Sequence, residues 1–156
     1  MDPFSIISGV AGVATAGSAL ASVLYDFIRS IQDAPREMIE IARTVRELSS
    51  VLRELRRILI QGRQHFKERL FRAVRSATRR IKEVHEEIGG LLDHNGGGLS
   101  RVLWAFRRSK ASKLLAKIET HKSAVQLIAT TMLLAIEARR QSAATAFVLP
   151  LPTVAC

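Results

Sequence analysis

The sequence predicts an all-α fold, an antiparallel bundle of four to five helices with a Gly/Ala-rich N-terminal helix. Three observations predict it. The prolines lie near the ends of the expected elements, so residues 36–149 form a proline-free interval that favours long helices. Apolar residues recur at three- and four-residue spacing along several segments, and no segment shows the alternation typical of a strand. The connections between these segments are short, as between antiparallel neighbours.

The first segment, residues 1–27, is the one around which the rest of the chain is organised. Residues 3–25 carry no charge, and an apolar run of about 18 residues is long enough to span a bilayer. Asp2 and Pro3 indicate a helix start. Each glycine weakens this helix by about 1 kcal/mol relative to alanine, which indicates close packing or flexibility, and we expect a break near Gly17. Apolar residues recur on one face at Phe4, Ile7, Val10 or Ala11, and Ala14, and then on one stripe at Leu20, Val23 or Leu24, Phe27 and Ile31. The small pairs Ser8/Gly12, Ala14/Ser18 and Ser18/Ser22 are four residues apart, and we expect this small-residue face to pack on the bundle.

Two strongly amphipathic helices are predicted next. The first runs from Pro35 to about Ile60, with Gly62 as its stop, and the second from Phe66 to residues 89–92. Their apolar residues keep helical spacing and are expected to form the core: Met38, Ile41, Ala42, Val45, Leu48, Leu52, Leu55 and Leu59, then Phe66, Leu70, Val74, Ala77, Ile81, Val84 and Ile88.

The last third of the chain is predicted to hold one more long helix. Residues 93–98, Asp-His-Asn-Gly-Gly-Gly, form a turn, and residues 99–106 form a short helix or turn. The long helix is expected over residues 109–140, with Leu114, Ile118, Val125, Ile128, Met132, Ala135 and Ile136 facing inward. Residues 141–156 lose this periodicity and carry no charge. We therefore predict a bundle domain over residues 1–140 and a tail or the start of a linker over residues 141–156.

The charge is strongly positive and grouped. The net charge is +10 and the sequence pI is about 11.0, so the chain is drawn to acidic partners, either nucleic acid or anionic lipid. Residues 53–82 are dense in Arg and Lys and contain only Glu54 and Glu68 as acids. A solvated helix face is the simpler interpretation, and contact with an anionic membrane, worth about 1 kcal/mol per cation, is the other. The residues assigned to that contact are Arg53, Arg56, Arg57, Arg63, Lys67, Arg72, Arg75, Arg79 and Arg80.

No catalytic, metal or cofactor site is predicted, and we expect a protein that is not an enzyme. The glycine-rich stretches 9–12 and 96–98 lack the context of a phosphate-binding loop. None of the histidines pairs with another His or a Cys at metal-ligand spacing, and His85, beside Glu86 and Glu87, is expected on an exposed helix face. The single cysteine, Cys156, cannot form an intramolecular disulfide, which fits a reducing compartment.

Several short stretches carry a resemblance to a known family: residues 1–6 (MDPFSI) with the Gly-Ala run after them, 24–25 (LY) leading to 34–35 (AP), 47–52 (ELSSVL), 102–106 (VLWAF) and 121–123 (HKS). Together they resemble the fungal HeLo-like N-terminal domain of NLR-type and ankyrin-repeat receptors, also described as the N-terminal domain of azaphilone pigment cluster protein L. The resemblance covers about residues 1–140. It implies a helical bundle, often fused to a sensor, that acts in regulated cell death by membrane targeting through its first helix. By that analogy the residues that enter lipid are Phe4, Ile6, Ile7, Gly9, Val10 and Gly12.

Three functions remain open on these grounds. The first is a cytoplasmic effector that is recruited to the plasma membrane on activation. Its first helix is released and inserts into anionic lipid, and the bundle forms a homo-oligomer. An NLR-type sensor protein is its expected partner. The second is a non-enzymatic adaptor bundle for protein–protein signalling, in which the first helix is core and Gly12→Leu should destabilise the fold. The third is nucleic-acid binding by residues 53–82. Trp104 and Tyr25 are too few and too scattered for a base-stacking platform, which disfavours specific nucleic-acid recognition.

Overall fold

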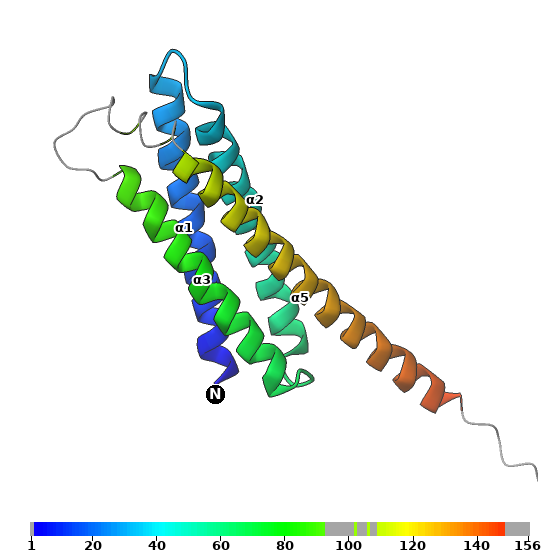
Figure 1. Ribbon diagram of the computed structural model, residues 1–156. Coiled ribbons are helices and arrows are strands. Elements are labelled where there is room, and N and C mark those ends of the chain that lie inside the picture. The colour runs from blue at the N-terminus through cyan, green and yellow to red at the C-terminus, as the bar shows by residue number, and fades with distance from the viewer. Residues whose placement is uncertain (1, 93–101, 103–105, 107–108, 149–156) are drawn as a thin grey trace, which may run out of the picture.

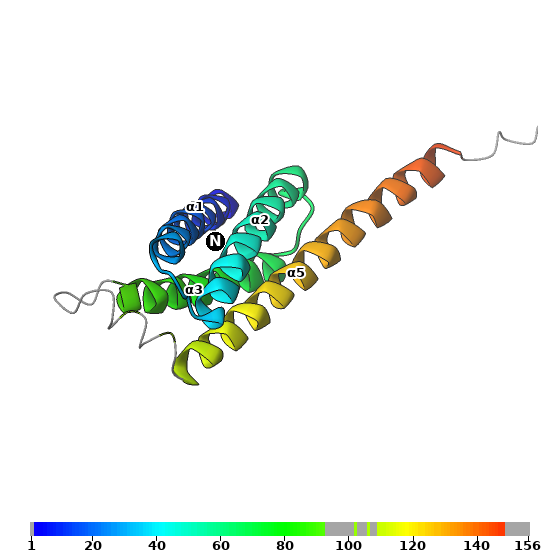
Figure 2. The ribbon, with the colours of Figure 1, turned by 90° about the horizontal axis from the view of Figure 1, so that it is seen from above.

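The protein is a bundle of long helices in the computed structural model, which describes residues 2–92, 102, 106 and 109–148. The helices are α1 (Pro3–Ser30), α2 (Arg36–Gly62), α3 (Glu68–Leu92) and α5 (Ser109–Phe147), and successive helices run in alternating directions (Figure 1). Among the described residues, α1 packs on α2 and α3, α5 packs on the same two helices, and α1 does not contact α5. Figure 2 shows this arrangement from above, with α1 and α5 on opposite corners. The predicted fold class is confirmed.

Helix α1 is a single unbroken helix. The Asp2 carboxylate accepts a hydrogen bond from the Phe4 backbone N–H at 3.1 Å, and Pro3 occupies the first turn. The expected break near Gly17 is wrong: the helix continues through it to Ser30. Gly17 is buried where α1 crosses Ser49 of α2 and His85 of α3, so its missing side chain serves close approach rather than flexibility.

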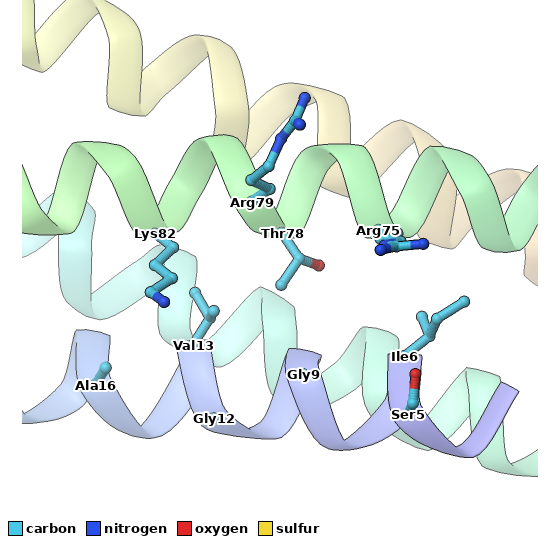
Figure 3. Close-up of a pocket in the computed structure, with 10 residues that line it drawn as sticks. All are labelled: Ser5, Ile6, Gly9, Gly12, Val13, Ala16, Arg75, Thr78, Arg79 and Lys82. Carbon is cyan, nitrogen blue, oxygen red and sulfur yellow. The ribbon is translucent and has the colours of Figure 1, made fainter. Parts of the chain in front are cut away.

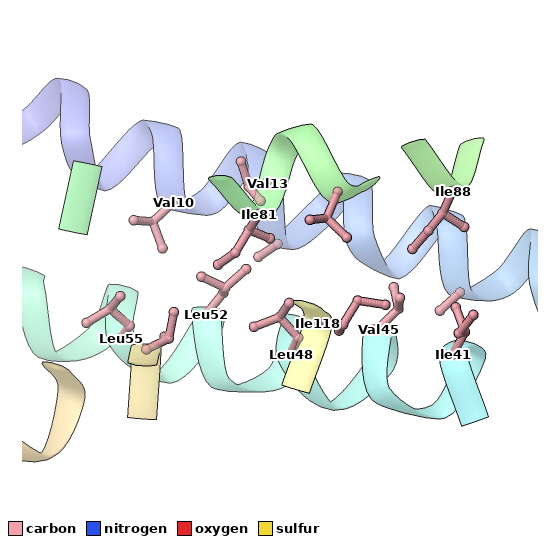
Figure 4. Packing of buried hydrophobic residues seen from close by; sticks show 14 of the residues in the cluster. Val10, Val13, Ile41, Val45, Leu48, Leu52, Leu55, Ile81, Ile88 and Ile118 are labelled. Carbon is pink, nitrogen blue, oxygen red and sulfur yellow. The ribbon is translucent and has the colours of Figure 1, made fainter. Parts of the chain in front are cut away.

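Helix α2 supplies the centre of the core. It ends at Gly62, as predicted, and a Cβ there would run into the ring of Phe66. All eight of its predicted core residues are buried, and Figure 4 shows several of them meeting Val10 and Val13 of α1.

Helix α3 differs from the prediction at both its start and its middle. It begins at Glu68, so Phe66 lies in the connection, where its ring packs edge-on against Phe71 with centroids 6.3 Å apart. His85 is buried, with 7% of its surface exposed, and the expectation of an exposed His85 is therefore wrong. It lies on the same inward stripe as Ile81 and Ile88, four residues after one and three before the other.

Helix α5 continues past Arg140, where it was expected to end, as far as Phe147. Residues 137–148 are all exposed, and this part of the helix projects away from the bundle (Figures 1 and 2). Val102 and Phe106 are helical and buried. The predicted turn at residues 93–98 and the rest of the 99–106 element lie outside the described residues.

A polar cluster ties α5 to α2. Lys122 contacts Glu47 of α2 at 2.8 Å and Glu119 of its own helix at 3.0 Å, and the Thr44 hydroxyl donates to Glu119 at 3.1 Å. The hydrogen bond to Glu47 raises the pKa of Lys122. On the other side, Lys117 of α5 contacts Glu87 of α3 at 3.1 Å. Helix α5 is therefore held to both neighbours by charge as well as by apolar packing.

Candidate functional site

The candidate site is helix α1 with the surfaces that flank it. In the described part of the chain, α1 is the one helix that is long and apolar enough to cross a membrane, a statement about length and composition only. Less than half of its most apolar stretch, 39%, is buried inside the bundle. The helix therefore has two faces of similar width, one against α2 and α3 and one toward solvent.

The residues expected to enter lipid are divided between these two faces. Ile6, Ile7 and Val10 are buried, with 5%, 7% and 0% of their surface exposed. Phe4 is 68% exposed, and Gly9 and Gly12 are exposed as well, so the expected packing of the small-residue face on the bundle is wrong at Gly12. The structure thus does not bring the six residues to one surface, and their joint contact with lipid requires α1 to leave the bundle.

The solvent face of α1 is uncharged from Pro3 to Tyr25, and two of its hydroxyls are hydrogen-bonded within the helix. The Thr15 hydroxyl donates to the carbonyl of Ala11 at 3.0 Å, and the Ser22 hydroxyl donates to the carbonyl of Ser18 at 3.1 Å. A hydroxyl bonded to the backbone four residues earlier does not need water as a partner, which makes its transfer into an apolar medium less costly.

Helix α1 is held mainly by apolar contacts. Among the described residues, no ion pair joins α1 to another helix. Two polar contacts link α1 to α2: the Arg53 guanidinium donates to the Ser18 hydroxyl, and Arg46 lies over the Tyr25 ring, 4.9 Å from the ring centroid. This attachment contrasts with the ion pairs that hold α5. Separation of α1 from the bundle would therefore break few polar contacts.

A groove of about 440 Å³ runs between α1 and α3 (Figure 3). Its α1 wall is small and apolar, and a Cβ at Gly9 or Gly12 would meet nothing within 4 Å. The two glycines therefore do not serve close helix packing. On the α3 wall, Thr78 and Lys82 point toward α1, whereas the Arg79 guanidinium points back across α3. Lining residues are Ser5, Ile6, Gly9, Gly12, Val13, Ala16, Arg75, Thr78, Arg79 and Lys82.

The cations assigned to lipid contact are all exposed, but they do not form one patch. Arg53 lines the groove between α1 and α2, whereas Arg75 lines the groove between α1 and α3, so these cations border different edges of α1. Arg80 instead lies close to His121 of α5. The pKa of His121 is lowered mainly by burial, and the positive charges of Arg80 and Lys117 lower it further. The nearby carboxylates take up part of the charge, as in the exposed pair between Arg79 and Glu83 at 4.0 Å. The exposed positions are Arg53, Arg56, Arg57, Arg63, Lys67, Arg72, Arg75, Arg79 and Arg80.

A buried histidine at the junction of three helices was missed by sequence reasoning. Both ring nitrogens of His85 are buried without a hydrogen-bond partner, beside Gly17 of α1 and Ser49 of α2. Burial lowers the pKa of His85 to about 4, so the ring is neutral at neutral pH. The spacing of the sequence could have predicted this burial, because His85 lies on the same helical stripe as Ile81 and Ile88. The neighbouring Glu86 and Glu87 indicated exposure instead.

The described residues contain no group of three or more His, Cys, Asp or Glu side chains arranged to hold a metal ion. A family model described as pigment biosynthesis cluster protein PigL N-terminal matches residues 1–148. No match was found among curated proteins or among solved structures.

Proposed function

Because the chain belongs to the pigment biosynthesis cluster protein PigL N-terminal family, the HeLo-like family expected from its first residues, we propose that it is a membrane-targeting effector bundle and not an enzyme. In this proposal α1 is held in the bundle at rest. After release it inserts into an anionic membrane, and the bundle oligomerises. The protein is cytoplasmic until it is recruited to the plasma membrane, and an NLR-type sensor is the partner that releases it.

One observation carries the proposal: a helix that is uncharged from Pro3 to Tyr25 lies between cations at both of its edges. Arg53 of α2 borders one edge of α1, and Arg75 and Lys82 of α3 border the other. A membrane that touches the outer face of α1 therefore meets positive charge on either side of it. Each cation near an anionic surface contributes about 1 kcal/mol, so the body of the bundle would be held at the headgroups while α1 exchanges protein neighbours for acyl chains.

The burial of α1 indicates that lipid must receive the helix as it leaves. Exposing Ile6, Ile7, Val10, Val13 and Leu24 to water would cost on the order of 10 kcal/mol, at about 1.5–3 kcal/mol for each side chain. That cost is comparable with the whole stability of a domain, so α1 does not leave into water. In lipid the same side chains keep an apolar environment. The remaining free-energy cost then comes from the apolar surface of α2 and α3 that α1 uncovers.

The test is dye release from vesicles of phosphatidylcholine and phosphatidylserine, with the full chain and a matched pair of variants. Ala19 lies on the exposed face of α1, and Ala116 is exposed on α5, which does not contact α1. Each is replaced by Asp. Both variants should fold equally well, but a carboxylate within an inserted helix costs roughly 2.5–3.5 kcal/mol. We expect Ala19→Asp to lose most of the dye release and Ala116→Asp to retain it. Equal release by the two variants, or none from the unmodified chain, would rule out insertion of α1.

The second candidate, an adaptor bundle that never contacts lipid, is favoured by the burial of Val10 and Leu24, which have no exposed surface at all. It predicts that the amides of α1 stay protected from hydrogen exchange when anionic vesicles are added. Gly12→Leu no longer separates the two functions, because Gly12 is exposed and its Cβ position is open. Faster exchange along α1 on adding vesicles would eliminate the adaptor function.

A further inference from the structure

A second groove, about 550 Å³ in volume, runs along the other edge of α1, between α1 and α2. Its volume falls within the range of about 300–1,000 Å³ that is typical of small-ligand sites. The α1 wall presents Ser18, Ser22, Tyr25 and Arg29, which are spaced four, three and four residues apart. Side chains at this spacing share one stripe of a helix, so the wall is continuous over three turns.

The α2 wall of this groove presents two arginines, Arg46 and Arg53. Arg46 stacks on the Tyr25 ring at 4.9 Å, and the Arg53 guanidinium donates to the Ser18 hydroxyl. Within the described part of the chain, neither forms an ion pair with a carboxylate. A ring face and a hydroxyl orient the two guanidinium groups without neutralising them. Arg29, which pairs with Asp26 of its own helix, adds a third cation at the end of the groove.

Hydroxyl donors line the same groove between the cations. The Ser22 hydroxyl donates to the Ser18 carbonyl at 3.1 Å, and the Ser50 hydroxyl donates to the Arg46 carbonyl at 3.4 Å. Those carbonyls already lie within helices, so each hydroxyl can rotate to donate to a ligand instead without leaving a buried group unpaired. The groove thus offers guanidinium and hydroxyl donors side by side.

We propose that this groove binds a phosphate monoester. Guanidinium groups bind phosphate oxygens bidentately, and a monoester carries a charge of about −1.5 to −2 at pH 7, which suits two unpaired arginines. A diester carries a single charge and one fewer terminal oxygen. The monoester can belong to a lipid headgroup or to a soluble molecule. The lipid source rests on the proposed function, since it gives the bundle a headgroup to hold, whereas the soluble source does not.

Two binding measurements on the full chain separate the two sources. Calorimetry with inorganic pyrophosphate tests for a soluble ligand. Co-sedimentation tests for a lipid, with phosphatidylcholine vesicles that contain either phosphatidic acid, a monoester, or phosphatidylserine, a diester, at matched surface charge. Pyrophosphate binding alone would identify a soluble ligand, and preferential binding to phosphatidic acid would identify a headgroup; either result supports the site. No pyrophosphate binding together with equal binding to both vesicles would overturn it.

Matched variants test whether the groove itself is responsible. Replacing both Arg46 and Arg53 by Gln should weaken binding roughly tenfold or more, because charge-assisted bonds are lost from two arginines. The control replaces Arg43 and Arg140 by Gln, which removes the same charge from exposed positions outside the groove. Equal weakening in both pairs would mean general charge attraction and would overturn the proposal.

A conservative variant and an insertion variant complete the test. Arg53→Lys keeps the charge but removes the planar fork, so it should also weaken binding; unchanged binding would contradict bidentate recognition. Ala19→Asp, which should block insertion of α1, should leave pyrophosphate binding intact. The site and the insertion of α1 can therefore fail independently.

Discussion

The contrast between two glycines of α1 gives the sharpest prediction about how the helix is seated. A Cβ at Gly17 would lie 2.8 Å from Cε1 and 3.3 Å from Nε2 of His85, and closer still to the Ser49 hydroxyl. Both neighbours are buried, so neither can swing into solvent. A Cβ at Gly12 would meet nothing within 4 Å. The same substitution, Gly→Ala, should therefore have opposite effects at two positions five residues apart.

The magnitudes follow from the contacts. Alanine in place of glycine stabilises a helix interior by about 1 kcal/mol, and at Gly12 this gain stands alone. At Gly17 the gain is opposed by overpacking of about 1–3 kcal/mol and by disturbance of the hydrogen bond from Ser49 to the Val45 carbonyl, worth about 1 kcal/mol. We expect Gly12→Ala to be about 1 kcal/mol more stable than the unmodified chain and Gly17→Ala about 1–2 kcal/mol less stable.

Thermal and urea unfolding measure both changes. For a domain of this size, 1 kcal/mol corresponds to a shift in Tm of about 2–4 °C, so the two variants should move in opposite directions by a resolvable amount. Gly9→Ala is the matched control, since its Cβ position is also open, and it should behave like Gly12→Ala. A rise in Tm for Gly17→Ala equal to that of Gly12→Ala would refute the close packing of α1 on Ser49 and His85.

Three further predictions follow from the same structure. Burial lowers the pKa of His85 from 6.5 to about 4, so as the pH falls the unfolded chain takes up a proton at this position before the folded chain does. The free energy of unfolding should therefore keep its full value above pH 6.5 and fall by up to about 3 kcal/mol toward pH 4. His85→Leu should flatten the unfolding free energy between pH 5 and 6.5, and an unchanged pH slope would contradict a buried neutral ring. Lys122→Met should lower the unfolding free energy by about 1–2 kcal/mol, measured in urea, because it leaves Glu47 and Glu119 without their shared cation. A chain that stops after Arg140 should keep the Tm of the full chain within about 2 °C, since residues 141–148 are exposed, and a larger loss would show that they pack on the bundle.

The amphipathic helices were predictable because their large apolar side chains are stable only when they are buried in the core. In α2, the spacing of the Leu, Ile and Val side chains marked the buried face correctly at every predicted position. Helix α1 was harder, because Gly, Ala and Ser fit both a core and a surface and so mark no face. Of the residues that the sequence placed on one face or stripe, Ile7, Val10, Ala14 and Leu24 are buried, whereas Phe4 and Val23 are exposed. The buried face also includes residues that the pattern did not mark: Ile6, Val13, Gly17 and Ala21.

The end of α5 was predicted wrongly, and nearness in sequence did not show how the cations of residues 53–82 are distributed in space. The end of α5 was placed at Arg140 because periodicity stops there, yet residues 141–147 include several alanines, the best helix formers, and need no buried face to continue a helix. The cations of residues 53–82 are close in sequence, but Arg53 and Arg75 border different edges of α1, so the charge is divided. Neither the division nor the α1–α2 groove can be read from one helix alone, because each depends on which helices are neighbours.

In the bundle, α1 and α5 each pack on α2 and α3, and this arrangement explains why oligomerisation would accompany the proposed release of α1. Helix α5 stays attached to α2 and α3 through Lys122 and Lys117, so the other three helices remain together. The departure of α1 uncovers the side of α2 that meets Val10 and Val13, where Leu52 and neighbouring residues have essentially no exposed surface in the resting bundle. A contiguous apolar surface of this kind is not stable in water. In the proposed membrane-bound state, the cations beside α1 would hold this surface at the headgroups rather than within the lipid. A second copy of the bundle, which would expose the same surface, is then the partner best matched to cover it.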